Sequence, residues 1–196
     1  MNTQTKDTRS HILEVGRSLT ARQGYAGVGL SELLKAADVP KGSFYHYFAS
    51  KEAYGCALLE DFVVQYRKNL GDTLLDPKRN ARERLLGYFE GWYKKQTGPA
   101  LQDRCLVVKL SAEVADLSEG MSRILQNGVA DIVARLAETL KEGIAEGSIA
   151  PIPNPDDVAH SLYHQWLGAS LVAGLSRDDG PLKAAMKMTA NAIPPA

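Results

Sequence analysis

The chain has 196 residues, of which 44% are hydrophobic, and this length allows one small domain and a larger one with its own core. Lys and Arg number 23, as do Asp and Glu, which excludes a protein that is basic overall but not one with a locally basic surface. Two cysteines and no apolar run of about 18 residues exclude a disulfide framework and a transmembrane helix. With no signal peptide, we expect a cytoplasmic protein that has no membrane partner.

The first predicted helix runs from about Thr8, a candidate N-cap, to Gln23, and Gly24 ends it. Its apolar stripe consists of Ile12, Leu13, Val15, Leu19 and Ala21. Residues 1–50 carry six Lys and Arg against four Asp and Glu, and Lys51 follows at once. The N-terminal part of the chain therefore carries a small net positive charge.

Two short helices and a tight turn are predicted next. The first covers residues 30–37 and places four apolar side chains on one face, Leu30, Leu33, Leu34 and Ala37. Pro40 disfavours helical backbone at the residue before it, so this helix ends near Asp38. The second covers the residues SFYHYF, and the Ser50 hydroxyl caps the helix that follows. This arrangement predicts a helix-turn-helix DNA-binding unit.

The second short helix carries candidate DNA contacts. Phe44 and Phe48 are four residues apart and are expected to pack inward, which leaves four polar or amphipathic side chains outward, Ser43, Tyr45, His46 and Tyr47. Tyr and His side chains hydrogen-bond phosphates or base edges in a groove. Lys41 and Lys51 flank the helix and would lie near phosphates, while Gly42 permits close approach of the DNA backbone. The alternative is that the aromatic side chains are core and the lysines are solvated.

The rest of the chain is predicted to be helical as well. Helices are expected at about residues 50–71, within DRCLVVKLSAEVADLSE, and at about residues 81–96, 119–146, 155–174 and 181–192. Ser118 is the candidate cap of the long helix that begins at Glu119. No stretch alternates with a period of two, so we predict an all-α fold of about nine helices. Residues 1–50 form the predicted DNA-binding domain, and residues 51–196 form a larger ligand-sensing and dimerisation domain.

The segment DVPKGSFYHYFASKEA resembles the signature of the tetracycline-repressor family of one-component bacterial regulators. The resemblance covers Thr8 to about Leu59 and implies a DNA-binding transcriptional regulator with a helix-turn-helix domain. Two positions depart from the family pattern. Val28 and Gly29 replace the usual Thr-Ser pair, so the cap of the first short helix comes from Gly29 or Ser31. Asp38 replaces the usual Gly before the turn and tolerates left-handed backbone less well.

The resemblance also implies phosphate contacts from residues that precede the recognition helix. Thr8 and Arg9 touch phosphate in this interpretation, and Ser31 at the start of the first short helix is a further candidate. The alternative for Thr8 and Arg9 is an ordinary helix cap and a solvated arginine. These residues complete the predicted contact set for a double-stranded DNA operator.

The segment SLYHQWLGASLVAGLS is apolar on more than one face, which predicts burial on several sides. With the last helix it provides candidate dimer-interface residues, Leu162, Trp166, Leu167, Leu171, Leu182 and Met186. The alternative is a monomeric core. The resemblance implies a homodimer, because this family pairs through its last two large helices. Two recognition helices about 34 Å apart would then bind a near-palindromic operator.

Cys105 is the candidate sensor. Thr97 or Asp103 would cap a helix that has Cys105 in its first turn, where the helix dipole and Arg104 lower a thiol pKa. The alternative is a small buried hydrophobic residue, and for Cys56, early in the fourth helix, packing is the expected role.

The segment CLVVKLSAEVADLSE is similar to one in the N-ethylmaleimide-responsive and acrylate-responsive repressors of the family. This similarity implies a response to electrophiles or short unsaturated acid derivatives. The first of these repressors uses the matching cysteine, partnered by a lysine on the penultimate helix. The position that corresponds to that lysine is Gly174 in this chain, a departure from the pattern.

A reversible apolar pocket is the other sensing hypothesis. Its candidate lining residues are Trp92, Tyr93, Tyr163, His164 and Trp166, although such aromatic residues are more often simply core. His160 and His164 are spaced as a metal pair on one helix face, but no further ligand has supporting spacing. We therefore expect no metal and no cofactor.

Two functions remain from the sequence. The first is a homodimeric repressor that an unidentified small molecule releases from its operator, either by reaction at Cys105 or by reversible binding. The second is a small thiol enzyme that uses Cys105 with a histidine base. No histidine lies near Cys105 in the sequence and no oxyanion loop is evident, so we expect a regulator and no enzyme.

Overall fold

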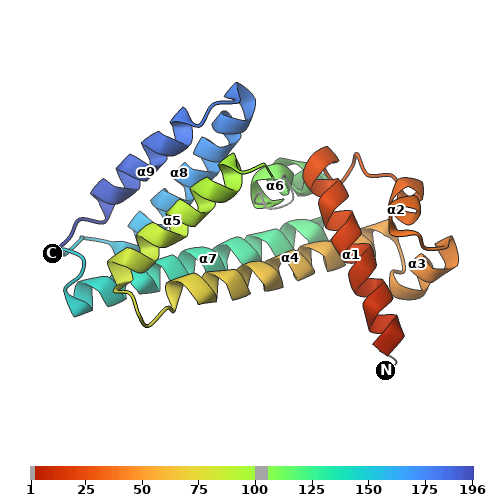
Figure 1. Cartoon of the computed structure of the whole chain (residues 1–196), viewed down its shortest axis with the longest axis horizontal. Coiled ribbons are helices and arrows are strands. Elements are labelled where there is room, and N and C mark those ends of the chain that lie inside the picture. Colours follow the sequence, from red (N-terminus) through yellow and green to blue (C-terminus); the bar gives the residue numbers. More distant parts are fainter. Residues whose placement is uncertain (1–2, 100–105) are drawn as a thin grey trace. The chain divides into compact units, whose positions relative to one another are not determined.

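The structure is a computed structural model that describes residues 3–99 and 106–196. The described residues form nine α-helices and contain no strand (Figure 1). The helices are α1 Thr3–Gln23, α2 Leu30–Ala37, α3 Lys41–Tyr47, α4 Lys51–Leu74, α5 Ala81–Thr97, α6 Leu106–Leu117, α7 Glu119–Glu146, α8 Pro155–Ser176 and α9 Gly180–Ala192. The predicted all-α class is therefore confirmed. Across the described ranges, no helix is both long enough and apolar enough to span a bilayer.

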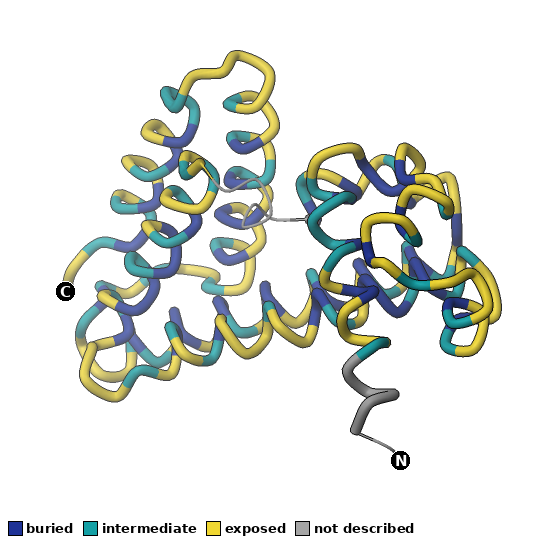
Figure 2. The backbone as a smooth tube through the Cα atoms, turned by 45° about the vertical axis from the view of Figure 1, so that its right-hand side comes forward, coloured by how far each residue is buried: buried dark blue, intermediate teal, exposed yellow. Residues whose placement is uncertain are grey.

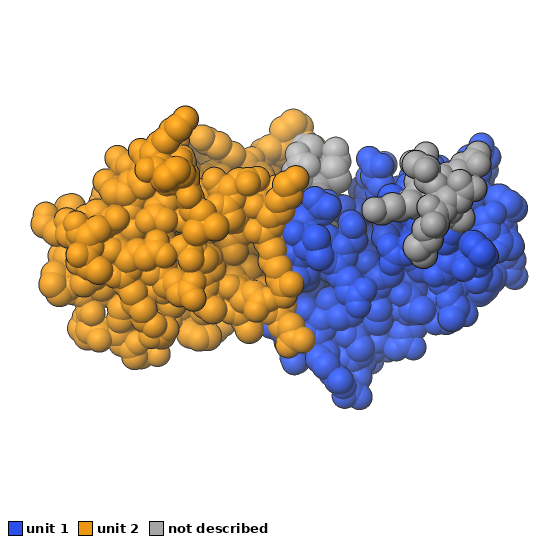
Figure 3. Space-filling model, turned by 90° about the horizontal axis from the view of Figure 1, so that it is seen from below, with its two compact units in different colours: residues 1–65, 100–126 blue, residues 66–99, 127–196 orange. Residues whose placement is uncertain are grey.

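The chain divides into two compact units (Figure 3). Unit 1 comprises Met1–Gln65 and Ala100–Gln126, and unit 2 comprises Tyr66–Pro99 and Asn127–Ala196. Helices α4 and α7 each contribute residues to both units, because each continues past the point at which the packing partners change. The predicted functional boundary after residue 50 is a different division and stays a prediction.

Local sequence signals account for most helix ends. The Ser50 hydroxyl accepts a hydrogen bond from the Ala53 amide at 3.0 Å, and the Ser118 hydroxyl accepts one from the Met121 amide at 3.2 Å. Both predicted caps are thus confirmed. One prediction was wrong: α1 begins at Thr3, so Thr8 lies inside the helix and is not its N-cap. The helix extends further because no breaking residue separates Thr3 from Thr8.

The core of unit 1 is aromatic. Tyr54 of α4 lies 5.5 Å from Phe44 and 5.3 Å from Phe48, measured between ring centroids, and all three side chains are buried. Gly16 allows α1 to approach this cluster, since a Cβ atom there would lie 1.7 Å from the Tyr54 hydroxyl oxygen. Along the long helices, buried positions follow one side and exposed positions the other, as Figure 2 shows in dark blue and yellow.

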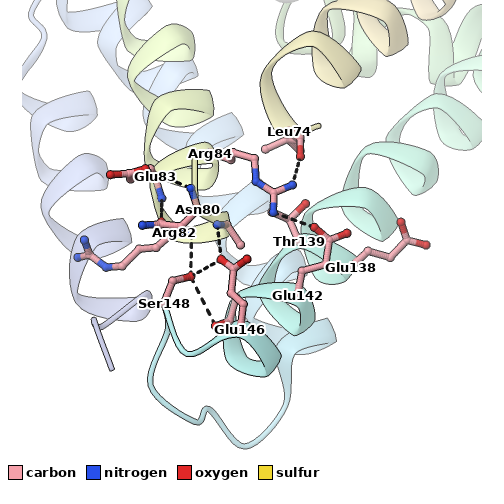
Figure 4. Close-up of polar contacts among 12 residues, drawn as sticks. Leu74, Asn80, Arg82, Glu83, Arg84, Glu138, Thr139, Glu142, Glu146 and Ser148 are labelled. Carbon is pink, nitrogen blue, oxygen red and sulfur yellow. Dashed lines mark hydrogen bonds and ion pairs between the residues drawn. The ribbon is translucent and has the colours of Figure 1, made fainter. Parts of the chain in front are cut away.

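Unit 2 contains a polar network at the start of α5 (Figure 4). Arg84 is buried and donates to the Leu74 carbonyl at 2.6 Å, and its guanidinium pairs with Glu142 at 3.0 Å. Asn80 and Glu83 form a capping box at the helix N-terminus. Glu146 of α7 accepts a further hydrogen bond from the Ala81 amide at 2.5 Å. The contacts from Glu146 and Asn80 satisfy the Ala81 and Glu83 amides, which the first turn of α5 would otherwise leave unpaired.

Candidate nucleic-acid interface

The turn between α2 and α3 has helix-turn-helix geometry. Gly29 is the N-cap of α2 with extended backbone, and its lack of a side-chain cap agrees with the departure from the family pattern noted above. Asp38 ends α2 in the left-handed conformation with φ 51°, and the amides of Asp38 and Val39 close the helix onto the carbonyls of Lys35 and Leu34. Pro40 then begins α3 from extended backbone.

The side chains of α3 divide into a buried and an exposed set. Phe44 and the following Phe48 are buried, as predicted, at 0% and 3% exposure. Tyr45 is 47% exposed and His46 is exposed, whereas Tyr47 is half-buried with its ring 4.9 Å from that of His46. The exposed aromatic and imidazole groups are therefore available to hydrogen-bond donors and acceptors outside the protein.

Two lysines flank this exposed set. The Lys41 ammonium lies 5.9 Å from the centre of the Tyr45 ring, and the Lys51 ammonium lies 5.1 Å from that of Tyr25. Within the described ranges, neither lysine forms an ion pair with a carboxylate. A Cβ atom at Gly42 would meet nothing within 4 Å, so the backbone there is open. Both positive charges thus remain available to an external anion.

An open hollow of about 480 Å³ lies between α2 and the start of α3. Its lining brings together the predicted contacts Ser31 and Lys41, along with Lys35 and the turn residues Asp38 to Pro40. Ser43 is half-buried beside this turn. On α1, the Arg9 guanidinium lies 5.5 Å from the centre of the Phe48 ring, which places Arg9 beside the same helix.

The sensor candidates are placed differently. Cys105 lies outside the described residues. Cys56 in α4 is half-buried, and burial, with the nearby charges of Glu52 and Glu60, raises the pKa of its thiol. A raised pKa reduces the thiolate fraction and hence the reactivity of Cys56. This agrees with the packing role expected for that residue.

The aromatic residues suggested for a reversible pocket form a packed cluster in unit 2. Phe89 stacks on Trp166 at 5.2 Å between centroids, and Trp92 contacts Tyr163 at 5.5 Å. The indole N–H of Trp92 donates to Ser170 at 3.0 Å, and that of Trp166 donates to Thr189 at 2.9 Å. These are the contacts of a packed core, which the sequence left open as the alternative.

The other two suggested pocket residues do not join this cluster. The Tyr93 hydroxyl donates to Asp179 at 2.6 Å, and this hydrogen bond raises the pKa of Tyr93. His164 is exposed and lies outside the packed aromatic cluster, so its contribution to a ligand pocket stays a prediction. His160 and His164 lie side by side at 5.9 Å between centroids, yet no group of three potential metal ligands occurs among the side chains described.

The structure also corrects the predicted dimer interface. Leu162, Trp166 and Leu182 are buried inside the protomer, where α8 packs against α9, so they cannot contact a second copy directly. Leu171 is exposed, and Leu167 and Met186 are half-exposed. Three further apolar residues of the same two helices are exposed, Val172, Leu175 and Met188. Because the segment is apolar on several sides, its sequence alone did not distinguish the inward from the outward face.

Glu113 of α6 was not among the residues predicted from the sequence. Its carboxylate accepts hydrogen bonds from the backbone amides of Tyr25, at 3.1 Å, and Ala26. A contact between residues so far apart in the chain leaves no local pattern. No spacing rule would have found it.

Comparison with known proteins supports the helix-turn-helix interpretation. Residues 12–53 match the family described as bacterial regulatory proteins, tetR family, and residues 81–189 match the family described as tetracyclin repressor-like, C-terminal domain. The chain is 42% identical over 194 residues to the HTH-type transcriptional repressor NemR of Escherichia coli (strain K12), covering 98% of both chains. It is 31% identical to the HTH-type transcriptional repressor DhaR of Mycobacterium sp. (strain GP1), covering 95% of this chain and 92% of DhaR.

The fold comparison agrees. The crystal structure of the reduced form of E. coli NemR matches with a TM-score of 0.92 at 42% identity, covering 97% of this chain and 98% of NemR. The similarity spans the N-terminal DNA-binding and the C-terminal helical regions alike. The chain therefore belongs to the tetR family of bacterial transcriptional regulators.

Proposed function

We propose that this regulator is a homodimeric repressor that places α3 in the major groove of a near-palindromic operator. The observation that carries the proposal is the division of α3 itself: Phe44 is buried in unit 1, whereas Tyr45 and His46 are exposed. Lys41 and Lys51 flank them, and neither lysine pairs with a carboxylate among the residues described. Exposed aromatic rings next to free ammonium groups make a poor solvent-facing surface and a good groove-facing one.

The proposed contacts fall into two kinds. Tyr45, His46, Tyr47 and Ser43 would approach base edges or nearby phosphates, with Gly42 allowing the backbone close. Lys41 and Lys51 would neutralise phosphates, and Thr8, Arg9 and Ser31 would add contacts on either side. Phosphate contacts fix orientation and supply salt-dependent affinity, while groove contacts carry sequence preference.

Dimerisation is proposed through the exposed apolar patch of α8 and α9, which consists of Leu171, Val172, Leu175 and Met188. Leu175 is 85% exposed, which is unfavourable for a leucine in water. Half-exposed Leu167 and Met186 extend the patch on the same two helices. A second copy covering it would form a four-helix bundle and hold two recognition helices about 34 Å apart, one turn of DNA.

The test of operator binding uses a duplex that the wild-type protein selects from a random pool. Tyr45→Ala and Tyr47→Ala are each expected to weaken binding by about five- to 150-fold at physiological salt, since each groove contact contributes about 1–3 kcal/mol. Circular dichroism and sedimentation should show that both variants stay folded with unchanged oligomeric state. Unchanged operator binding by both variants would refute the assignment of α3 as the recognition helix.

The dimer is tested separately. Leu175→Glu is expected to shift sedimentation towards the monomer and to weaken operator binding, because a buried unpaired charge is strongly unfavourable. Leu75→Glu is the matched control, since Leu75 is also in unit 2 and 57% exposed but lies outside α8 and α9. A dimer that persists in Leu175→Glu would count against this interface.

For induction we propose modification of Cys105 by an electrophile or oxidant. The E. coli NemR structure was solved as a reduced form, and the present chain is 42% identical to it. Of the two cysteines, Cys56 has a raised thiol pKa, which leaves Cys105 as the better candidate for a reactive thiolate. With N-ethylmaleimide, the thiolate sulfur would bond to one alkene carbon and the other would take a proton from water.

N-ethylmaleimide or hypochlorite should release wild-type protein from the operator, and Cys105→Ala should resist release. Mass spectrometry should locate the adduct on the peptide that contains Cys105. If Cys105→Ala is released like wild type, Cys105 is not the sensor. Release by an apolar compound without any mass change would instead support the reversible-inducer alternative.

A further inference from the structure

The loop between α1 and α2 holds the carboxylate of Glu113. After Gly24, which has φ +80°, the backbone amides of Tyr25 and Ala26 point in the same direction. One carboxylate oxygen of Glu113 accepts from Tyr25 at 3.1 Å and the other accepts from Ala26. Consecutive amides in such a turn form an anion-binding concavity, and a side chain of α6 fills it here.

Glycine is required at position 24 for two reasons. The positive φ disfavours any residue with a Cβ atom, and a Cβ atom there would lie 2.8 Å from a Glu113 carboxylate oxygen. The turn is therefore shaped both to expose two amides and to leave room for the carboxylate. We call this contact, formed by Glu113 with the amides of Tyr25 and Ala26, the Glu113 anchor.

Tyr25 extends the anchor to the helix that follows α3. Its hydroxyl donates to the Lys51 carbonyl at 2.6 Å, and Lys51 is the first residue of α4. Its ring packs against Gly55, where a Cβ atom would lie 2.8 Å from both the Tyr25 ring and the Met121 sulfur. Tyr25 is thus held at its backbone by α6 and at its hydroxyl by the residue proposed to contact phosphate.

A second contact joins the end of α6 to α4. The Ser118 hydroxyl donates to a Glu52 carboxylate oxygen at 2.6 Å while it caps α7 through Met121. The corner between α6 and α7 is consequently fixed to the first turn of α4. Together, the Glu113 anchor and this contact attach the C-terminal half of α6 and the corner after it to the α1–α2 loop and to the first turn of α4, all within unit 1.

We propose that Glu113 is the positioning residue that couples α6 to the DNA-binding helices. A displacement of α6 would pull the Tyr25–Ala26 turn, and through Tyr25 it would shift Lys51 at the start of α4. By linkage, operator binding must in turn restrain α6, because coupling between two positions is reciprocal. The inference rests on the proposed operator binding, but not on any particular inducer.

The experiment compares amide hydrogen exchange of the intact chain with and without the selected operator duplex. The variants are Glu113→Ala, Glu113→Gln and the control Asp116→Ala, which removes an exposed carboxylate of the same helix. Operator is expected to slow exchange of the α6 amides by about tenfold in wild type and in Asp116→Ala. In Glu113→Ala this effect should disappear, and Glu113→Gln should recover part of it through its remaining acceptor oxygen.

A purely structural role gives a different result. Exchange in Glu113→Ala would then be faster with and without operator by the same factor, so that the operator-dependent ratio would match wild type, and the inference would be overturned. If wild type selects no duplex at all, the proposed function fails and the inference fails with it. If wild type binds operator but N-ethylmaleimide does not release it, only the Cys105 proposal fails, and the exchange ratio still decides the role of Glu113.

Discussion

The hydroxyl of Tyr25 donates a hydrogen bond to the backbone carbonyl of Lys51 at 2.6 Å. Burial, followed by the charges of Cys56, Glu52 and Glu113, raises the pKa of Tyr25 to about 12. The hydroxyl therefore stays protonated and able to donate throughout the physiological pH range. This bond fixes the first residue of α4 relative to the α1–α2 loop.

Tyr25→Phe removes this bond but keeps the ring packed against Gly55. We expect a loss of about 1 kcal/mol in the free energy of unfolding, the typical net value of one hydrogen bond. Urea denaturation measures it. Tyr45→Phe is the control, because no hydrogen bond of the exposed Tyr45 hydroxyl occurs among the contacts described, and its stability should match wild type. Equal midpoints for wild type and Tyr25→Phe would show that the bond contributes nothing.

The flanking lysines should determine the salt dependence of operator binding. Each phosphate contact releases a condensed counterion, so Lys41→Ala and Lys51→Ala should each reduce the slope of log K against log salt by about 1 per protomer. Lys78→Ala, an exposed lysine of unit 2, should leave the slope unchanged. Fluorescence anisotropy at several salt concentrations gives these slopes. If both lysine variants have the same slope as wild type, Lys41 and Lys51 do not contact phosphate.

Strong local signals made part of this structure predictable from the sequence. Helix α2 and helix α7 have the predicted bounds, because Pro40 stops the first and Ser118 caps the second. The inward face of α3 was also predictable, since Phe44 and Phe48 have helical spacing. In each case one or two neighbouring residues determine the backbone, so the information lies within a few positions.

Contacts between distant segments were not predictable in this way. The Glu113 anchor joins α6 to a loop that lies far earlier in the chain, and neither segment has a pattern that requires the other. The inner face of α8 presented a related difficulty, because Trp166 and Leu175 look alike in a uniformly apolar segment although one is fully buried and the other 85% exposed. The packing of α5 and α9 around Trp166 distinguishes the two residues.

Because α1 lies close to Tyr54, replacing Gly16 of α1 by alanine should lower the free energy of unfolding. In Gly16→Ala the new methyl group would lie 1.7 Å from the Tyr54 hydroxyl oxygen, and the Tyr54 ring packs against both Phe44 and Phe48. We expect a loss of about 1–3 kcal/mol from overpacking, measured by thermal or urea denaturation. Gly29→Ala is the control, because a Cβ atom there meets nothing within 4 Å.

Removing the Tyr54 hydroxyl should restore part of the stability that Gly16→Ala loses. The Tyr54 hydroxyl is buried and has no hydrogen-bond partner in the part of the chain that the structure describes. Tyr54→Phe should therefore be neutral or slightly stabilising, since it removes an unsatisfied polar group. The double variant with Gly16→Ala should recover part of the lost stability, but not all of it, because the ring carbon would still lie 2.9 Å from the new methyl group. A strongly destabilising Tyr54→Phe would contradict this account.

The two cysteines should differ in reactivity. Burial and the charges of Glu52 and Glu60 raise the pKa of the Cys56 thiol, so less thiolate is present at neutral pH than for a free cysteine. In Cys105→Ala, N-ethylmaleimide should modify Cys56 more slowly than it modifies free cysteine, and the rate should still increase as the pH rises above 8. Mass spectrometry of samples quenched at successive times measures the rate of modification. Cys56 modification as fast as that of free cysteine at neutral pH would contradict the expected low reactivity.

Glu146 should make the stability of unit 2 depend on pH. The hydrogen bond from Ser148, followed by that from the Ala81 amide and the charge of Arg84, lowers the pKa of the Glu146 carboxyl (Figure 4). A lowered folded-state pKa means that the stabilisation is complete above the unfolded value of about 4.3 and is lost as the pH falls through the folded value.

Glu146→Gln keeps an acceptor oxygen but cannot ionise. Its melting temperature should therefore lie below that of wild type at pH 7, and the two should converge in acid as wild-type Glu146 becomes protonated. Glu90→Gln removes an exposed carboxylate of α5 and controls for the change in net charge. Differential scanning calorimetry across the acid range provides the comparison. Wild-type and Glu146→Gln melting temperatures that stay parallel down to acid pH would mean that ionised Glu146 does not stabilise the start of α5.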